Sequence, residues 1–128
     1  MQRTPPPGVS QLLTAAVQRF QAGNLREAEH LLRRVLALDP RRAVALHLLG
    51  VVAAQAGHAA DAVELIGMAI ASNPRDATAH SSLGNVLQQQ GRLDAAIASY
   101  RRAIALQPAF PEALNNLANA LKARKKLP

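Results

Sequence analysis

The stretch Ala77 to Pro108 reads ATAHSSLGNVLQQQGRLDAAIASYRRAIALQP. Counting Ala77 as position 1, small residues stand at positions 8, 15, 20 and 27, and a proline stands at position 32. Much of this template occurs twice more upstream, and its glycines, alanines and prolines recur at an interval of 34 residues. The three series are Gly23, Gly57 and Gly91; Ala28, Ala62 and Ala96; and Pro40, Pro74 and Pro108. Three series that agree on one period predict a chain built from repeated structural units.

Each recurring residue suits one place in a pair of helices. Glycine adopts the left-handed conformation that closes a helix, so Gly57 and its equivalents should end the first helix of each pair. Proline costs roughly 3 kcal/mol inside a helix, so Pro74 and its equivalents should stop the second helix. Gly50 and Gly84 fall inside first helices, where glycine costs on the order of 1 kcal/mol relative to alanine. We expect a neighbouring helix to approach closely at both.

This spacing resembles that of the tetratricopeptide repeat (TPR), a pair of antiparallel helices that stacks into a solenoid. The resemblance covers nearly the whole chain and implies an all-α, right-handed TPR superhelix of three helix pairs plus one additional helix. The expected organisation is a flexible Pro-rich tail (1–8), three repeats (9–42, 43–76 and 77–110), a fourth first helix (111–124) and a basic tail (125–128). At the start of the second helix in repeat one, Asn24 followed by Glu27 predicts a capping box.

Composition excludes several classes of site and compartment. The chain has 128 residues and no cysteine, so disulfides and thiolate metal sites are impossible, and the composition fits the cytoplasm. No apolar run approaches the roughly 20 residues of a membrane span, and Met1–Gly8 does not resemble a secretory signal. We therefore predict a cytoplasmic protein that does not use a membrane.

The net charge of +7 has two readings. Basic faces keep a small helical protein soluble, and they also suit an acidic partner such as nucleic acid. Phe20, Tyr100 and Phe110 are the only aromatic residues, whereas single-stranded nucleic acids favour stacking on aromatic side chains. Nucleic acid is therefore the less favoured partner.

The residue pattern contains no constellation typical of catalysis. None of the four histidines, His30, His47, His58 and His80, stands three or four residues from another, so no helical metal site is predicted. Asp61 and Asp94 begin second helices, where a negative charge suits the helix dipole. There is no nucleophile elbow and no phosphate-binding loop. We predict no enzyme, no metal and no cofactor, and a packing role for His80.

The resemblance implies that first helices line a concave groove through positions 2, 5, 6, 9, 12 and 13 of each unit. In the second repeat these positions are largely apolar, which favours contact with a partner's side chains or coverage by residues 1–22. In the third repeat they form a polar stripe of Thr78, Ser81, Ser82, Asn85, Gln88 and Gln89, and Asn115, Asn116 and Asn119 extend it. Amides carry both donors and acceptors and can hold an extended peptide backbone. The predicted peptide contacts are Leu48, Val51, Gln55, Ser82, Asn85, Gln89, Asn116 and Asn119.

Two subfamilies offer closer comparison. Repeat proteins that clamp chaperone C-terminal carboxylates use groove lysines and arginines, and here the matching positions hold Leu13, Val44, His47, Thr78 and Ser82. The residues Ser81–Gly91 and Leu114–Lys122 resemble repeats of O-linked N-acetylglucosaminyl transferases, which carry an asparagine ladder at groove position 6. Only Asn116 matches that ladder; Thr14, Leu48 and Ser82 depart from it.

The function predicted from these features is non-catalytic binding of a protein or extended peptide in the groove. Asn85→Ala combined with Asn116→Ala is expected to weaken a partner without unfolding the chain. Two alternatives stay open. The chain could be the substrate-recruiting N-terminal segment of a larger enzyme such as a glycosyltransferase. It could also be an assembly module, forming a homo-oligomer through the fourth first helix, whose internal-repeat residues have no second helix to cover them.

Overall fold

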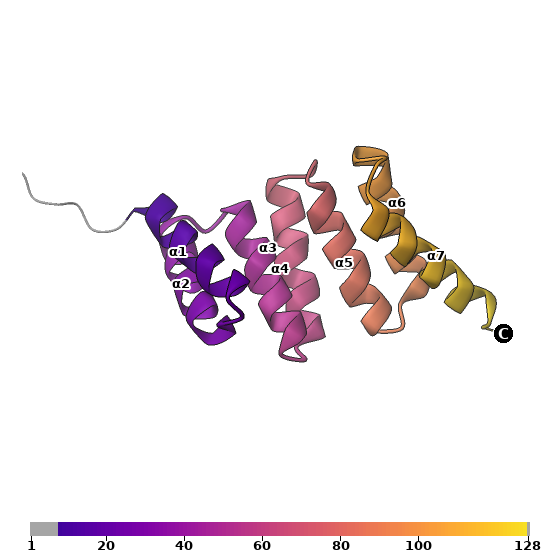
Figure 1. Cartoon of the computed structure of the whole chain (residues 1–128), viewed down its shortest axis with the longest axis horizontal. Helices are drawn as coiled ribbons and strands as arrows, with labels where there is room; N and C mark the ends of the chain where they lie inside the picture. The colour runs from indigo at the N-terminus through magenta and orange to yellow at the C-terminus, as the bar shows by residue number, and fades with distance from the viewer. Residues whose placement is uncertain (1–7, 128) are drawn as a thin grey trace, which may run out of the picture.

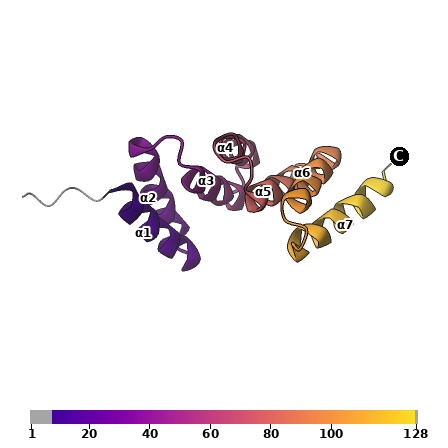
Figure 2. The ribbon, with the colours of Figure 1, turned by 90° about the horizontal axis from the view of Figure 1, so that it is seen from above.

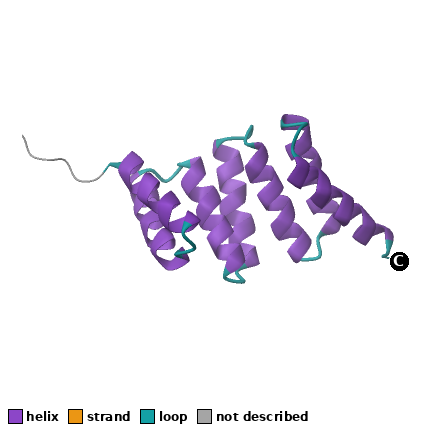
Figure 3. Cartoon of the chain, in the orientation of Figure 1, coloured by secondary structure: helices purple, strands orange, loops and turns teal. Residues whose placement is uncertain are grey.

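The computed structural model describes residues 8–127, and within them it forms seven α-helices and no strand (Figure 3). The helices are α1 (Val9–Gln21), α2 (Leu25–Leu38), α3 (Ala43–Gln55), α4 (Ala59–Ser72), α5 (Ala77–Gln89), α6 (Leu93–Leu106) and α7 (Pro111–Lys125). The all-α prediction is confirmed. Apart from Gly8, the predicted Pro-rich tail lies outside the described residues.

The helices stack in chain order into an elongated superhelix, with α1 and α7 at opposite ends (Figure 1). Each helix packs mainly against its neighbours in sequence, and α3–α5 and α5–α7 also touch. Seen from above, α1, α3, α5 and α7 follow one side of the row while α2, α4 and α6 follow the other (Figure 2). The row bends so that its two ends reach toward the side of the odd-numbered helices, which makes that side concave.

All three recurring glycines, Gly23, Gly57 and Gly91, end their helices with positive φ, as their recurrence predicts. Gly57 and Gly91 have φ of +86° and +77°, a conformation that side chains disfavour. The amide of His58 donates to the Ala53 carbonyl at 2.8 Å, and that of Gly57 donates to the Ala54 carbonyl at 3.1 Å. This pair of bonds is a Schellman motif, which satisfies carbonyls that the helix end leaves without partners. The chain therefore reverses into the next helix within three residues.

The internal glycines are sites of close helix approach. A Cβ at Gly84 would lie 2.5 Å from Tyr100 Cε1, and a Cβ at Gly50 would lie 2.6 Å from Ile66 Cγ1. Each glycine thus admits a large side chain from the second helix of its own pair. This confirms the predicted reason for tolerating glycine inside a helix.

The predicted capping box at Asn24 is wrong. Asn24 stands at the N-cap position of α2, but its side chain makes no capping bond. Glu27 instead forms an ion pair with Arg19 of α1 at 2.9 Å, which draws the carboxylate away from the helix start. A side-chain cap does form at α5, where Asp76 accepts hydrogen bonds from the amides of Thr78 and Ala79.

The core is spread along the length of the stack, as a solenoid requires. Its largest fully buried side chains are those of Leu32, Val35, Ile66 and Tyr100. They come from three different helices, and each belongs to a cluster formed with adjacent helices. None of the helices between residues 8 and 127 combines the length and hydropathy needed to cross a membrane.

Candidate functional site in the concave groove

A small cavity opens between α3 and α5, two helices of the concave side (Figure 2). Its volume is about 190 Å³. We call it the α3–α5 groove, and its lining residues are Val51, Ala54, Gln55, Ser82, Asn85, Val86 and Gln89. Five of the eight predicted contacts therefore meet in one place: Val51, Gln55, Ser82, Asn85 and Gln89.

The other three predicted contacts lie around this groove. Leu48 is half-buried and packs against the core cluster that joins α1, α2 and α3. Asn116 reaches from α7 to Asn85, with its Nδ2 donating to Asn85 Oδ1 at 3.0 Å. Asn119 is exposed on the same helix. The polar stripe thus continues from α5 to α7 through a direct side-chain contact.

One member of the predicted stripe does not face the groove. Ser81 is only 3% exposed, and its hydroxyl oxygen is buried without a hydrogen-bond partner in the part of the chain that the structure describes. The template places position 5 on the concave side, but packing within the stack buries this serine. The accessible polar surface of α5 is therefore narrower than its sequence indicates.

A fully buried phenol, that of Tyr100, holds Asn85 of the groove and the nearby Gln88. Tyr100 Oη lies 2.7 Å from Asn85 Oδ1 and 2.9 Å from the amide of Gln88. A phenol has one hydrogen, so it donates to one amide and must accept from the other. Because Asn116 already donates to Asn85 Oδ1, that atom is the acceptor for Tyr100 as well. The NH₂ of Gln88 must then face the phenol oxygen, an orientation that is assigned from the network.

The network fixes which groups are free for a ligand. Asn85 Oδ1 accepts two hydrogen bonds, and Asn116 Nδ2 donates one of them. Asn85 Nδ2 and Asn116 Oδ1 make no hydrogen bond to any residue between 8 and 127. The α5–α7 junction therefore presents one amide donor and one carbonyl acceptor, which are the two groups that a peptide backbone needs.

His47 links α3 to α5 beside the groove. Its Nε2 lies 2.8 Å from Ser82 Oγ, in a partly buried hydrogen bond. Burial lowers the pKa of His47 below the ordinary value of 6.5, and the nearby charge of Asp76 opposes part of that effect. His47 is therefore neutral at pH 7, and the Ser82 hydroxyl is already engaged before any ligand arrives.

The α3–α5 groove is electrically neutral, since none of its lining residues carries a charge at pH 7. Burial, with a smaller contribution from Glu112, raises the pKa of Tyr100 to about 12, so the phenol keeps its proton. A neutral groove suits a peptide backbone better than a terminal carboxylate. Its walls combine the apolar Val51, Ala54 and Val86 with amides.

Residues 8–127 contain no group of three or more histidines and acids placed to hold a metal ion. His80 is buried, and its Nε2 lies 2.9 Å from the Pro74 carbonyl, so it fastens the α4–α5 turn. This contact agrees with the packing role expected for His80.

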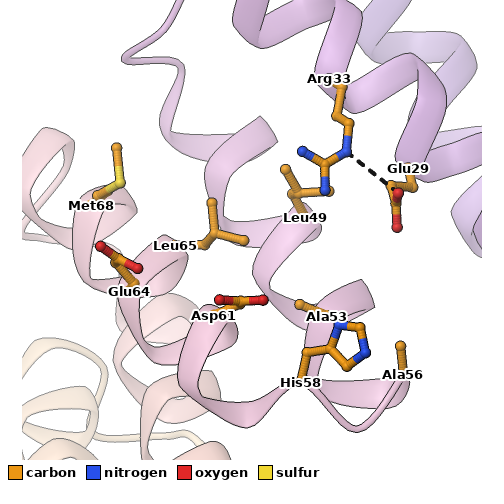
Figure 4. A pocket seen from close by; sticks show the side chains of 10 residues that line it. All are labelled: Glu29, Arg33, Leu49, Ala53, Ala56, His58, Asp61, Glu64, Leu65 and Met68. Carbon is orange, nitrogen blue, oxygen red and sulfur yellow. Dashed lines mark hydrogen bonds and ion pairs between the residues drawn. The ribbon is translucent and has the colours of Figure 1, made fainter.

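A second and larger pocket lies on the opposite side of the stack, where α2, α3 and α4 meet (Figure 4). Its volume is about 420 Å³, and acids of α2 and α4 surround an apolar floor. In the sequence, Asp61 is explained by the helix dipole, and nothing there connects it with Glu64 or Met68. The sequence feature that could have indicated this pocket is the small side chain of Ala53. Its effect, an unfilled space between two repeats, becomes visible only when the repeat interfaces are compared in space.

Comparison with known families and structures agrees with this architecture. The family described as "Tetratricopeptide repeat" matches residues 19–86, and the family described as "TPR repeat" matches residues 85–124. The first match alone spans more than half of the chain. No curated protein sequence matches the chain.

Three solved structures illustrate the likeness. The O-GlcNAc transferase of Thermobaculum terrenum is 34% identical over 88% of this chain, with a TM-score of 0.86, and the chain spans 22% of that enzyme. The MamA protein is 28% identical over 94% of this chain and 66% of its own, with a TM-score of 0.86. The first TPR of Spaghetti (RPAP3), bound to an HSP90 peptide, is 23% identical over 92% of this chain and 94% of its own, with a TM-score of 0.88. The last resemblance is one of fold.

The glycine-closed helix pairs, the 34-residue period and the match over residues 19–86 agree with one another. The chain therefore belongs to the tetratricopeptide repeat family, whose paired helices stack into a superhelix.

Proposed function

We propose that the chain binds an extended peptide segment of a partner protein in the α3–α5 groove and along α7, without catalysing a reaction. The observation that carries this proposal is a pair of free side-chain groups, Asn85 Nδ2 and Asn116 Oδ1. The two side chains are held together because Asn116 Nδ2 donates a hydrogen bond to Asn85 Oδ1. A peptide unit offers a carbonyl to Asn85 Nδ2 and an N–H to Asn116 Oδ1. Such backbone recognition depends little on the sequence of the peptide.

The groove also sets limits on the side chains of the peptide. A volume of about 190 Å³ corresponds to roughly six water molecules at their share of liquid volume, which is room for one medium-sized side chain. The neutral walls, with Val51 and Val86 beside Gln55 and Gln89, favour an uncharged residue at that point. We therefore propose a partner segment with an apolar side chain between freely hydrogen-bonding peptide units.

A positional crosslinking experiment tests where the partner lies. A photo-crosslinking residue replaces Gln55 or Gln89, both exposed and both lining the groove, and in a control it replaces Arg101, exposed on α6. Crosslinks to the same partner segment from the two groove positions, and none from position 101, support the proposal. A partner captured only from position 101 would contradict it.

A synthetic peptide of the captured segment then tests backbone recognition. N-methylation of single peptide bonds removes one N–H at a time, and at least one position should weaken binding by about tenfold, a loss of roughly 1.4 kcal/mol. Gln89→Ala should weaken the unmodified peptide, whereas Gln90→Ala, exposed but outside the groove, should not. Equal affinities for all N-methylated peptides would show that the backbone is not read.

A second candidate function rests on one specific comparison. The chain resembles part of an O-GlcNAc transferase at 34% identity while spanning 22% of that enzyme. We propose as the alternative that the groove recruits substrate polypeptides for a catalytic region encoded in the same gene. Sequencing the reading frame past the Pro128 codon separates the two: a catalytic domain in frame favours this candidate, and a stop codon removes it.

A further inference from the structure

The pocket shown in Figure 4 lies on the convex side of the stack, away from the α3–α5 groove. We call it the outer pocket. Leu49, Leu65 and Met68 supply its apolar surface, and Met68 is 49% exposed. Glu29 and Arg33 stand on α2, facing Asp61 and Glu64 on α4. Its volume of about 420 Å³ is more than twice that of the groove.

The outer pocket exists because two positions of the repeat carry different residues here. Thirty-four residues after Ala53 stands Leu87, which is only 5% exposed and belongs to the core cluster of α5 and α6. Thirty-four residues after Glu29 stands Val63, which packs against that same cluster. At the next repeat junction two apolar side chains thus occupy the space. At this junction an alanine and a carboxylate leave it open.

The charge at the outer pocket is opposite to that of the whole chain. Three carboxylates and one guanidinium line it, whereas the chain has a formal net charge of +7. Arg33 is committed to Glu29 at 3.4 Å. Asp61 and Glu64 form no ion pair with any residue between 8 and 127. The dipole of α4 accounts for Asp61, in its first turn, but not for Glu64 beside the exposed Met68.

The end of α7 has the complementary chemistry. Leu121 and Leu127 are 41% and 52% exposed. Lys122, Lys125 and Lys126 are exposed and form no ion pair within the described part of the chain, while Arg124 is held by Asp94 at 2.8 Å. Leucines interspersed with free lysines match an apolar pocket rimmed by free carboxylates.

We infer that the outer pocket binds the end of α7, residues 121–127, of a second copy of this chain. Leu121 enters the space beside Leu65 and Met68, and Lys122 and Lys125 pair with Asp61 and Glu64. The contact must be intermolecular, because α5 and α6 separate α7 from the outer pocket in the stack (Figure 1). The two contacting surfaces differ, so a bound pair still has one free pocket, on one copy, and one free α7 end, on the other. Association is therefore head to tail, weak and sensitive to salt.

The two methionines allow a direct test on the whole chain, because only Met1 and Met68 are present. An acceptor chain carrying Lys122→Gln and Lys125→Gln is labelled with ¹³C on the methionine methyls. Unlabelled donor chain carrying Asp61→Lys and Glu64→Lys is added up to about 1 mM, a concentration that detects the weakest class of contact. The Met68 signal should shift in proportion to bound donor, and the Met1 signal should not.

Matched variants set the specificity of this test. In these titrations the acceptor carries Lys122→Gln and Lys125→Gln, which removes its own lysines without adding charge that could repel a donor. Donor with Lys122→Gln and Lys125→Gln should lower the association constant about fivefold to tenfold, whereas donor with Arg101→Gln and Arg102→Gln, exposed on α6, should not. On the acceptor, Ala53→Leu supplies the side chain that Leu87 provides at the next junction and should block the shift. Circular dichroism confirms that each variant is folded.

Several outcomes would overturn the inference. One is a Met68 signal that never moves, and another is a shift that survives loss of the donor lysines. Sedimentation velocity of the unmodified chain gives a third. Self-association that persists with Asp61→Asn and Glu64→Gln, but disappears with Leu114→Gln on α7, would place the contact between two copies of α7 instead.

Discussion

His47, beside the α3–α5 groove, should make the stability of the chain depend on pH in the acidic range. Its pKa is lowered in the folded chain, so the unfolded chain binds more protons just below the ordinary pKa of 6.5. The stabilising contribution is complete above that value and is lost as the pH falls toward the folded pKa. Protonation also leaves Nε2 able only to donate to Ser82 Oγ.

We therefore predict that stability falls as the pH is lowered from 7 to 5. Urea unfolding followed by circular dichroism measures it at each pH. The His47→Gln variant, which keeps a polar group of similar reach, should lose the part of the decrease that His47 causes. If both chains respond identically to acid, His47 is not the cause.

Tyr100 produces the opposite behaviour in alkali. Its pKa rises to about 12 in the fold, so its contribution is complete below the unfolded value of roughly 10 and is lost between 10 and 12. Two units correspond to a loss on the order of 3 kcal/mol by pH 12. Tyr100→Phe should lack this alkaline decrease and be about 1 kcal/mol less stable at neutral pH, because Asn85 and Gln88 lose a partner. Thermal unfolding between pH 8 and 11.5 compares the two chains.

The same network changes what a substitution at Asn85 measures. Asn85→Ala with Asn116→Ala was expected to affect only binding, but Asn85 Oδ1 is the acceptor for a buried phenol. Removing it destabilises the α5–α6 pair as well as the site. Gln55 and Gln89, which line the groove and make no side-chain hydrogen bonds within residues 8–127, separate the two effects better.

At the scale of the helix, glycines with different backbone conformations should respond in opposite ways to alanine. Gly91 ends α5 with φ of +77°, where an alanine costs roughly 1–2 kcal/mol. Gly67 lies within α4, and a Cβ there would meet no atom within 4 Å. Gly67→Ala should therefore stabilise the chain by roughly 0.5–1 kcal/mol. Chemical denaturation measures the change in the free energy of unfolding for each variant. Destabilisation by Gly67→Ala would contradict the prediction for α4.

The helices were predictable from the sequence because their ends follow local backbone rules. Gly57 and Gly91 can take positive φ at little cost, and a proline restricts the residue before it, so α4 and α6 end at Ser72 and Leu106, two residues before Pro74 and Pro108. Side-chain partners were less predictable. Asn24 and Glu27 have the spacing of a capping box, but Arg19 competes for the carboxylate from another helix.

In the candidate site, too, helix faces were predictable from the sequence, whereas contacts between side chains were not. Five of the predicted contacts line the α3–α5 groove because a repeat template assigns helix faces well. Ser81 was misassigned because the template gives the face of a helix but not how closely its neighbours pack against it, and Ser81 is buried. The bonds from Tyr100 and Asn116 to Asn85 connect residues 15 and 31 positions apart, and no local pattern encodes them. The outer pocket was not predicted, because it results from the small side chain of Ala53 at a position where the next repeat has a leucine.

At the scale of the whole molecule, stability should vary along the stack. In a solenoid each unit depends on its neighbours, and the junction of the first two repeats contains the 420 Å³ outer pocket. We predict that amides of α1 and α2 exchange with deuterium faster than those of α5 and α6, because the first pair opens without the rest. Ala53→Leu should slow exchange in α1 and α2 by filling the junction. Uniform exchange rates across all four helices would contradict this.

The hydrogen bond from Tyr100 to Asn85 has a consequence for the kinetics of recognition. A side chain that is already held in place loses little rotational freedom when a partner arrives, which saves on the order of 0.5–1.5 kcal/mol of ordering entropy. The partner thus meets an Asn85 side chain that the protein itself already holds in one orientation. Encounters that align with this held amide should be retained longer than those at the exposed Asn119.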